Sequence, residues 1–268
     1  HVIRGEDLFS STPRQMLLLE ALGVESVPQY AHLPLIVGPD RQPLSKRHGS
    51  VAVERFREEG FLPEAMVNYL ALLGWSYDAE TTFFSRDDLV ERFDLSRVSH
   101  NPAAFDREKL EWMNGHYLRE APADRFADLL QQTLKEAGIA AERSVIEAAA
   151  PLVQERMRLL SEAPDLLRFL FEDVEPDEKA RKQLDGQGAY LSAAAASLDG
   201  AQPWATESIE RVLRELQEAR QLSARKAFQP LRAAVTGTLV SPPLFESMEL
   251  LGQDRTIERL RRAAELVG

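Results

Sequence analysis

The stretch PLIVGPDRQPLSKRHG, residues 34–49, divides the chain into two parts with different sequence patterns. Its first five residues form a short apolar run ending in glycine, which is typical of a buried strand that runs into a turn. Residues 40–49 are polar, end in glycine and carry three basic residues against one acid, so they are predicted to form a loop. Before this loop the pattern is mixed α/β, and from residue 51 onward the apolar spacing is mostly helical.

The composition excludes several classes of protein. The 268 residues leave room for about two domains, or several smaller ones, at ~100–200 residues each. The absence of cysteine excludes disulfides, thiol catalysis and cysteine-ligated zinc, and without an H-x-x-x-H pair no metal site is expected. No apolar run approaches the ~18 residues that cross a bilayer, so no membrane partner is expected. The formal charge of -11 means that any binding of nucleic acid must depend on local basic islands.

The mixed part contains a candidate ligand site at its beginning. Residues 2–7, VIRGED, begin as a predicted strand, and the arginine, the glycine and the two acids lie where this strand ends in a loop. Open α/β sheets build sites at such strand ends, and arginine can hold a carboxylate with two parallel bonds. A surface salt-bridge cluster is the alternative interpretation. Residues 11–15, STPRQ, predict a helix start with Thr12 as N-cap and Pro13 at the first helical position.

The second part is predicted to be a series of helices. Ser85 and Asp88 form the pattern of a capping box, and Asp106 is placed to cap the helix that follows it. Residues 229–243 are interrupted by proline and glycine. The three tryptophans are predicted to lie in the core; they are Trp75, Trp112 and Trp204. The lone histidines His100 and His116 are predicted to be structural. The predicted helices cover residues 63–74, 85–93, 106–117, 123–138, 142–160, 164–171, 206–222 and two segments after 244 and 254.

The basic loop has the residue types of a phosphate clamp. Lys46 and Arg47 follow the small hydroxyl residue Ser45 and precede Gly49, which suits a mobile loop around triphosphate oxygens. Phosphoryl and nucleotidyl transfer need positive charge where charge develops on the leaving pyrophosphate. A solvated basic turn is the alternative.

A basic island lies near the C-terminal end of the chain. Residues 219–245 contain four basic side chains and no acid, and they include the rigid apolar turn SPPLF at 241–245. Single-stranded nucleic acid needs positive charge for its backbone and rigid apolar surfaces for splayed bases. The alternative is that Pro242 and Pro243 serve only to start a helix.

Taken together, these segments resemble the bacterial glutamyl-tRNA synthetase family, whose members are class I enzymes. They occur in family order over nearly the whole chain, and LSKRHG is similar to the family's version of the KMSKS loop. The segments FLPEA…NYL…LGW and NPA.FD..KL.WMN resemble its stem-contact domain, and PLRAAVTG resembles the signature of its final anticodon-binding domain.

The resemblance implies a mainly α fold. It comprises a remnant of the class I Rossmann α/β catalytic domain (1–40), the KMSKS-type loop with an α-helical stem-contact domain (41–121), and two α-helical anticodon-binding domains (122–185 and 186–268).

The resemblance also implies roles for residues of the first part. Arg4 matches the arginine that binds the glutamate carboxylate, and Asp7 matches an acidic position near ATP. Lys46 matches the second lysine of KMSKS, which steadies ATP and the departing pyrophosphate, so Ser45 and Lys46 are the expected catalytic residues. Pro43 departs from the family, because the first KMSKS lysine usually stands there.

In the second part, the resemblance implies anticodon contacts. Arg232, Ser241, Pro242 and Leu244 fall on positions that contact the anticodon bases. Arg156 falls on an arginine that favours glutamate anticodons over glutamine anticodons.

The implied function is that of a glutamate–tRNA ligase. Such an enzyme activates L-glutamate with ATP, accompanied by Mg2+, and transfers it to the 3′ end of tRNA(Glu), and it is expected to be cytoplasmic and monomeric. No H-x-G-H element is present and the chain begins at His1 with strand residues, so we expect a C-terminal portion that cannot make glutamyl-adenylate alone.

Alternatives remain. They are a helical tRNA-binding module without catalytic ancestry, and a non-discriminating synthetase that charges both tRNA(Glu) and tRNA(Gln). A glutamyl-queuosine enzyme lacks the long helical extension, and glutaminyl-tRNA synthetase usually reads its anticodon with β-barrels, so both are disfavoured.

Overall fold

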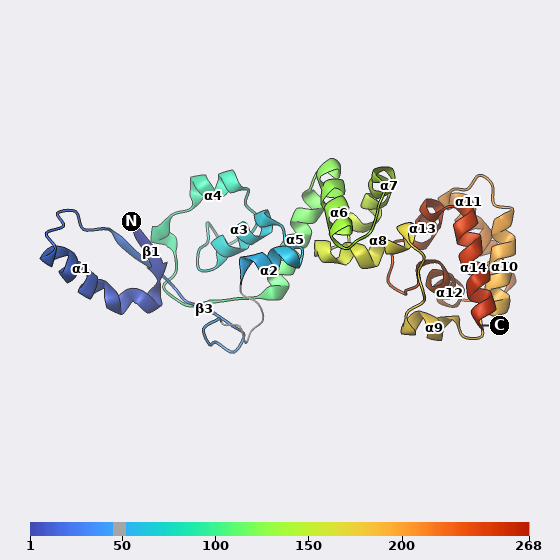
Figure 1. Ribbon diagram of the computed structural model, residues 1–268, viewed down its shortest axis with the longest axis horizontal. Coiled ribbons are helices and arrows are strands. Elements are labelled where there is room, and N and C mark those ends of the chain that lie inside the picture. Colours follow the sequence, from blue (N-terminus) through green and yellow to red (C-terminus); the bar gives the residue numbers. More distant parts are fainter. Residues whose placement is uncertain (45–51, 268) are drawn as a thin grey trace. The chain divides into compact units, whose positions relative to one another are not determined.

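The computed structural model describes residues 1–44 and 52–267 (Figure 1). The chain forms two compact units, residues 1–117 and 118–268. Helices dominate both, which confirms the predicted mainly α fold. Ser45 and Lys46, the expected catalytic residues, lie outside the described residues.

A two-stranded parallel sheet opens the first unit. β1 (Val2–Gly5) pairs with β2 (Tyr30–Leu33) in a register that places Arg4 opposite His32. The strand predicted at the beginning of the chain is therefore present, and it brings Arg4 beside a residue 28 positions away in the sequence.

The strand predicted at residues 34–38 is shorter than expected. β3 (Ile36–Val37) pairs in parallel with β4 (Ala103–Ala104). It ends at Val37 because Gly38 already belongs to a turn, in which its N–H donates to the carbonyl of Gln42 at 2.8 Å.

The prediction that Thr12 is an N-cap is wrong. A 3-10 helix, η1 (Glu6–Ser11), runs directly into α1 (Thr12–Ala21), so Thr12 is already helical. Ser11 stands at the N-cap, but its hydroxyl donates back to the carbonyl of Leu8 and makes no capping bond to the helix. The preceding 3-10 turn supplies the backbone geometry that a capping side chain would otherwise support. The Thr12 hydroxyl is consequently available for other contacts.

The core of the first unit lies among α3, α5 and the segments that precede them. Leu62, Tyr69, Leu110 and Met113 are almost completely buried there. Both predicted caps are confirmed, because the Ser85–Asp88 capping box is formed and Asp106 accepts from the backbone N–H of Lys109 at 3.0 Å. The helices are α2 (Val53–Glu58), α3 (Pro63–Leu72), α4 (Arg86–Arg92), the 3-10 helix η3 (Leu95–Arg97) and α5 (Arg107–Glu120).

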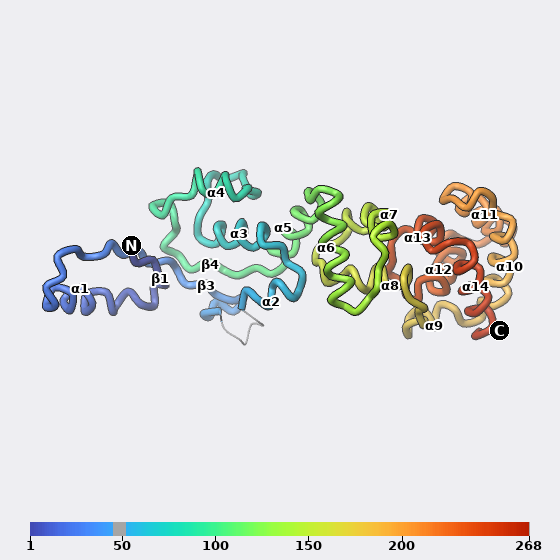
Figure 2. The backbone as a smooth tube through the Cα atoms, turned by 45° about the horizontal axis from the view of Figure 1, so that its top comes forward, coloured from blue at the N-terminus to red at the C-terminus, as the bar shows by residue number. Residues whose placement is uncertain are grey.

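The second unit is all helical in its described residues. α14 packs against α10 and α12 near the C-terminus (Figure 2), and α6 packs against α7 and α8. The helices are α6 (Ala123–Glu136), α7 (Arg143–Gln154), η4 (Leu160–Glu162), α8 (Ala163–Phe171), α9 (Glu178–Leu184), α10 (Gly188–Asp199), α11 (Thr206–Ala219), α12 (Ala224–Thr236), α13 (Leu244–Leu251) and α14 (Gln253–Val267).

The segment predicted to be interrupted by proline and glycine, residues 229–243, is helical at its start, since α12 continues through Pro230. Proline removes one helical hydrogen bond, here the one to the carbonyl of Lys226. Burial of Leu231 and Val235, both with 0% exposure, accompanies the helical conformation on the C-terminal side of the proline. The interruption comes only at Gly237, which adopts a left-handed conformation with φ 73°.

The tryptophans divide between core and surface. Trp75 is buried with Phe84 and Leu89, as predicted, and Trp204 is half-buried. For Trp112 the core prediction is wrong, because its side chain is 46% exposed. In the described part of the chain, no helix is long and apolar enough to cross a membrane.

Candidate nucleic-acid interface

Two arginines from separate helices converge on one carbonyl in the second unit. Arg156, just beyond the end of α7, donates from Nη1 to the carbonyl oxygen of Ser241 at 2.7 Å. Arg232 of α12 donates to the same oxygen at 3.3 Å and to the carbonyl of Pro242 at 2.6 Å. Arg232 also donates to the Ser241 hydroxyl. The structure thus brings together four of the five residues that were expected to contact an anticodon.

The two guanidinium groups form a positive site without a compensating ion pair among the described residues. Burial lowers the pKa of Arg232, the neighbouring charge of Arg156 lowers it further, and Glu246 partly offsets both effects. Arg156 is exposed and Arg232 half-buried. Such a pair suits an added acceptor, for example a phosphate oxygen or the edge of a base.

In the turn between α12 and α13, three of the residues expected to contact an anticodon have buried side chains. The side chains of Ser241 and Leu244 are each 5% exposed, and Pro242 is also buried. These residues therefore shape the turn and orient its carbonyls. Val240, which the sequence pattern did not single out, is 72% exposed and is the accessible apolar side chain of this turn.

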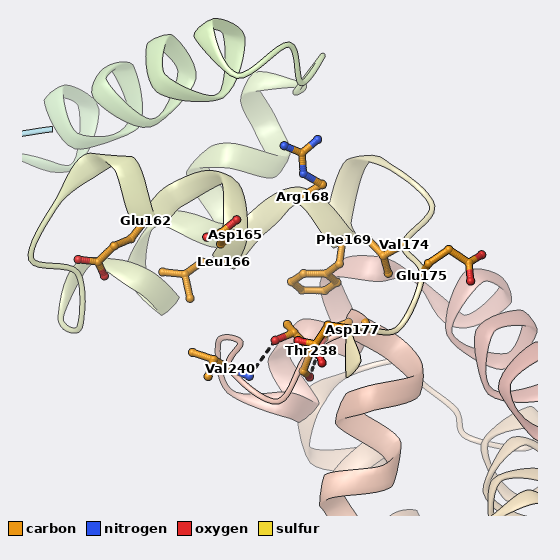
Figure 3. A pocket seen from close by; sticks show the side chains of 12 residues that line it. Glu162, Asp165, Leu166, Arg168, Phe169, Val174, Glu175, Asp177, Thr238 and Val240 are labelled. Atoms are coloured by element: carbon orange, nitrogen blue, oxygen red, sulfur yellow. Dashed lines mark hydrogen bonds between the residues drawn. The ribbon is translucent and has the colours of Figure 1, made fainter. Parts of the chain in front are cut away.

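A cavity of about 550 Å³ lies beside this turn (Figure 3). It is lined by side chains of α8, by the connector between α8 and α9, and by residues 236–240. Its lining carries one arginine, Arg168, against four acids: Glu162, Asp165, Glu175 and Asp177. This charge is unfavourable for phosphate, in contrast to the Arg156–Arg232 site.

Three arginines of α14 hold the last turn of α8 and the connector between α8 and α9. Arg255 donates to the carbonyl of Leu170 at 2.6 Å, Arg259 to that of Glu172 at 2.7 Å, and Arg262 to that of Val174 at 3.0 Å. This role was not predicted from the sequence. The spacing of four and three residues marks one stripe of the helix, which was the signal that could have indicated a shared partner.

In the first unit, Arg4 takes part in a local hydrogen-bond network. Its Nη2 donates to the hydroxyl of Thr12 at 2.7 Å, and its Nε donates to Nε2 of His32 at 3.3 Å. The Thr12 hydroxyl lies 3.0 Å from the same histidine nitrogen. Since Arg4 has only donors, this geometry requires Nε2 of His32 to be an acceptor, with the ring proton on Nδ1.

The network holds the Nε and Nη2 side of the Arg4 guanidinium, and Nη1 has no protein acceptor among the described residues. Asp7 is exposed, and its Oδ1 lies over Gly5, where a Cβ would be only 2.4 Å from it. The contacts of Thr12 and His32 with Arg4 were not predicted from the sequence, because the proximity of His32 depends on the register of β1 and β2.

The basic loop begins from a stem fixed to β3. Leu44 donates from its N–H to the carbonyl of Ile36 at 2.9 Å, and Pro43 bridges to Val37. Pro43 therefore belongs to the described stem. Among the residues that the structure describes, there is no group of three histidine or acidic side chains suited to a metal ion.

Comparison with known proteins identifies the two units. Residues 1–112 match the family described as tRNA synthetases class I (E and Q), catalytic domain, and residues 125–264 match the anticodon binding domain family. The glutamate–tRNA ligase of Saccharopolyspora erythraea is 44% identical over 97% of this chain and 55% of its own length. That of Mycobacterium marinum is 44% identical over 100% of this chain and 57% of its own length.

The chain belongs to the glutamyl-tRNA synthetase family. Solved structures agree with this. A glutamate tRNA ligase from Elizabethkingia meningosepticum, in complex with its amino acid, has a TM-score of 0.83 and 29% identity, covering 100% of this chain and 57% of that one. A glutamate-tRNA synthetase from Elizabethkingia anophelis has a TM-score of 0.78 and 31% identity, covering 99% of this chain and 56% of that one. The chain thus spans about half the length of the curated relatives that it matches.

Membership in the synthetase family separates the two sites by domain. The Arg4 network lies within the match to the catalytic domain, and the Arg156–Arg232 site lies within the match to the anticodon binding domain.

Proposed function

We propose that this chain provides the anticodon-recognition half and the KMSKS-type loop of a glutamate–tRNA ligase. The complete reaction activates L-glutamate with ATP and transfers it to the 3′ end of tRNA(Glu). The observation that carries this proposal is the convergence of Arg156 and Arg232 on the carbonyl of Ser241, within residues that match an anticodon binding domain.

The arginine pair is suited to an unpaired anticodon. Arg156 is exposed and holds the turn through a single carbonyl, so the rest of its planar group can meet a base edge or phosphate. Arg232 fixes the same turn from α12 and adds positive charge. Ser241, Pro242 and Leu244 give the turn its shape, and we assign anticodon contacts to its accessible backbone and edges.

The acidic cavity beside the turn supports the assignment of RNA contacts to the arginine pair. Its four carboxylates repel a phosphate backbone, whereas the arginine pair attracts one. The RNA therefore approaches the turn from the side of the arginines. We assign to Arg156 the preference for glutamate anticodons over glutamine anticodons.

In the first unit we assign the amino acid and nucleotide contacts. Arg4 binds the carboxylate of glutamate, and the Thr12–His32 network fixes its orientation for that role. Asp7 lies near ATP, and Ser45 and Lys46 of the basic loop steady the triphosphate and the departing pyrophosphate. Mg2+ accompanies ATP as part of the substrate.

We also propose the finer organisation implied by the family. The first unit combines a Rossmann remnant with a stem-contact domain, and the second combines two anticodon-binding domains divided near residue 185. The enzyme is a cytoplasmic monomer.

The proposed function is tested by binding of the chain to a glutamate tRNA transcript, to the same transcript with a changed anticodon, and to a glutamine tRNA transcript, at two salt concentrations. Preferential binding of the glutamate transcript supports an anticodon-reading half. Equal and strongly salt-dependent binding of all three would show only an electrostatic RNA surface. Equal binding of the two natural transcripts, with loss on anticodon change, would identify a non-discriminating enzyme.

A further inference from the structure

The carbonyl of Ser241 is held by two arginines that come from different parts of the second unit. Arg156, which follows α7, reaches it at 2.7 Å, and Arg232 of α12 reaches it at 3.3 Å. A donor and an acceptor about 3.6 Å apart no longer form a hydrogen bond. Both bonds therefore exist only while the end of α7 and α12 keep one particular separation.

One buried side chain of α14 joins the end of α8 to the end of α12. Arg259 donates from Nη2 to the carbonyl of Glu172, just beyond α8, at 2.7 Å. From Nη1 it donates to the carbonyl of Val235, in the last turn of α12, at 2.6 Å. The donors of a guanidinium have a fixed planar arrangement, so a side chain that holds two carbonyls also fixes the distance between them.

Two further arginines extend this connection along the same side of α14. Arg255 donates to the carbonyl of Leu170 at 2.6 Å, and Arg262 donates to that of Val174 at 3.0 Å. The segment 170–174 is therefore attached to α14 at its beginning, at its middle and at its end. A shift of the end of α8 along α14 would break several of these bonds at once.

The two ends of this connection lie close to the arginines that hold the turn. Val235 stands three residues after Arg232 on α12, and the hydroxyl of Thr236 donates to the carbonyl of Arg232 at 2.9 Å. On the other side, α8 packs against α7, which ends just before Arg156. A displacement of α8 relative to α12 would therefore move Arg156 relative to Arg232.

We propose that Arg259 is a positioning residue for anticodon recognition, because it sets the separation between Arg156 and Arg232. The proposal rests on the proposed function, in which these two arginines meet the anticodon. Arg259 is 4% exposed and therefore acts through them rather than by contact with RNA. Base readout by arginine depends on the alignment of its donors with the base edge. A changed separation should therefore weaken binding of the matching anticodon more than binding of an altered one.

The test compares discrimination ratios of the full chain. This ratio is the dissociation constant for the transcript with a changed anticodon divided by that for the glutamate transcript. Arg259→Lys keeps the charge but cannot hold both carbonyls in the same way, and it is expected to lower the ratio about 2- to 20-fold. Arg262→Met removes a neighbouring bond from a half-buried position and is expected to lower the ratio by less.

The controls separate positioning from stability. Arg261→Met removes the same charge as Arg262→Met from an exposed position of α14, and it is expected to leave the ratio unchanged. Circular dichroism melting defines a temperature at which every compared variant is folded, and Arg262→Met decides the test if Arg259→Lys does not fold. Arg156→Ala removes the residue through which Arg259 acts, so in that background neither α14 variant should lower the ratio further.

The outcomes distinguish this proposal from the proposed function. If the folded α14 variants keep the wild-type ratio, the packing of α13 against α7 and α8 sets the separation without Arg259, and the positioning role is overturned. An equal fall of the ratio with and without Arg156 also overturns it. Both results leave the proposed function intact. A wild-type chain that binds neither transcript, or binds both equally, would overturn both proposals.

Discussion

Arg259 donates from Nη1 to the carbonyl oxygen of Val235, at 2.6 Å, near the C-terminal end of α12. Its Nη2 donates to the carbonyl of Glu172 at 2.7 Å, so one side chain of α14 joins two other segments. The side chain is only 4% exposed, and burial lowers its pKa to about 10, with a further contribution from the charge of Arg255. Asp173 lies 3.9 Å away but is 81% exposed, so the two carbonyls are the main partners of the buried charge.

Removal of this side chain is expected to destabilise the second unit. Arg259→Met leaves two carbonyls without their donor, which predicts a loss of about 2–4 kcal/mol in the free energy of unfolding. Arg259→Lys keeps the charge but not the planar guanidinium that donates to two carbonyls at once, so an intermediate loss in the free energy of unfolding is expected. Urea unfolding followed by circular dichroism measures both. Arg261→Met, an exposed position on the same helix, is the matched control, and an equal loss in the two methionine variants would contradict the assignment.

The contacts of Arg259 could not be predicted from the sequence. The stripe of Arg255, Arg259 and Arg262 was visible as spacing, but charged stripes on a helix usually face solvent. Each of them donates to a backbone carbonyl 85 to 88 residues away, and Arg259 also to that of Val235, and carbonyls carry no sequence signal. His32 was missed for the same reason, because only the register of two strands brings it to Arg4.

Features decided by neighbouring residues were predicted well. The capping box of Ser85 and Asp88 and the cap at Asp106 depend on side chains that bond to backbone three residues away. Trp112 was misplaced because apolar spacing assigns a helix face to the core without showing whether another element covers it. The family resemblance assigned anticodon contacts to residues of the α12–α13 turn, which stay a prediction, and it did not indicate that Leu244 is buried.

Gly237 is expected to be intolerant of any side chain. Its φ is 73°, its carbonyl accepts from the N–H of Asp177 at 2.9 Å, and an added Cβ would lie 3.0 Å from the carbonyl oxygen of Glu175. Gly237→Ala should therefore strain the backbone and displace the connector between α8 and α9. Together these effects should lower the free energy of unfolding by about 2–4 kcal/mol. Chemical denaturation measures this loss.

Gly186 offers a matched control for the backbone term. Its φ is 69° and nothing lies within 4 Å of its added Cβ, so Gly186→Ala should cost only about 1–2 kcal/mol. The difference between the two variants isolates the close approach of residue 237 to the connector. Equal losses would show that the approach is unimportant for stability.

Arg232→Ala is expected to weaken binding of the glutamate transcript by roughly 1–3 kcal/mol, if the guanidinium meets a base edge as well as the turn. The loss should be smaller for the transcript with a changed anticodon, so discrimination between the two falls. Fluorescence anisotropy with labelled transcripts measures both constants. Arg225→Ala removes an exposed arginine from the same helix and should affect both transcripts equally. Unchanged affinity in a folded Arg232→Ala variant would remove this residue from the anticodon site.

The capping box at α4 predicts a dependence of stability on pH. Asp88 accepts from the hydroxyl of Ser85 at 2.6 Å and from its backbone N–H at 3.0 Å, and these bonds lower the pKa of its carboxyl. A lowered pKa means that the folded state favours the carboxylate. The stabilisation is then fully present above the unfolded-state pKa of about 3.9 and is lost as pH falls through the lower folded-state value.

Thermal melting between pH 7 and pH 2 should reveal this dependence. Asp88→Asn is expected to melt below the wild type at neutral pH, and the difference should shrink as the pH falls below about 4. Ser85→Ala removes the other half of the box and should lower the free energy of unfolding of the first unit by about 1 kcal/mol at neutral pH. Asp87→Asn changes a neighbouring acid in the first turn of α4 that lies outside the box, and it controls for the general effect of charge near the helix start. A difference between Asp88→Asn and wild type that stays constant down to pH 2 would mean that the carboxylate of Asp88 does not contribute through its ionised form.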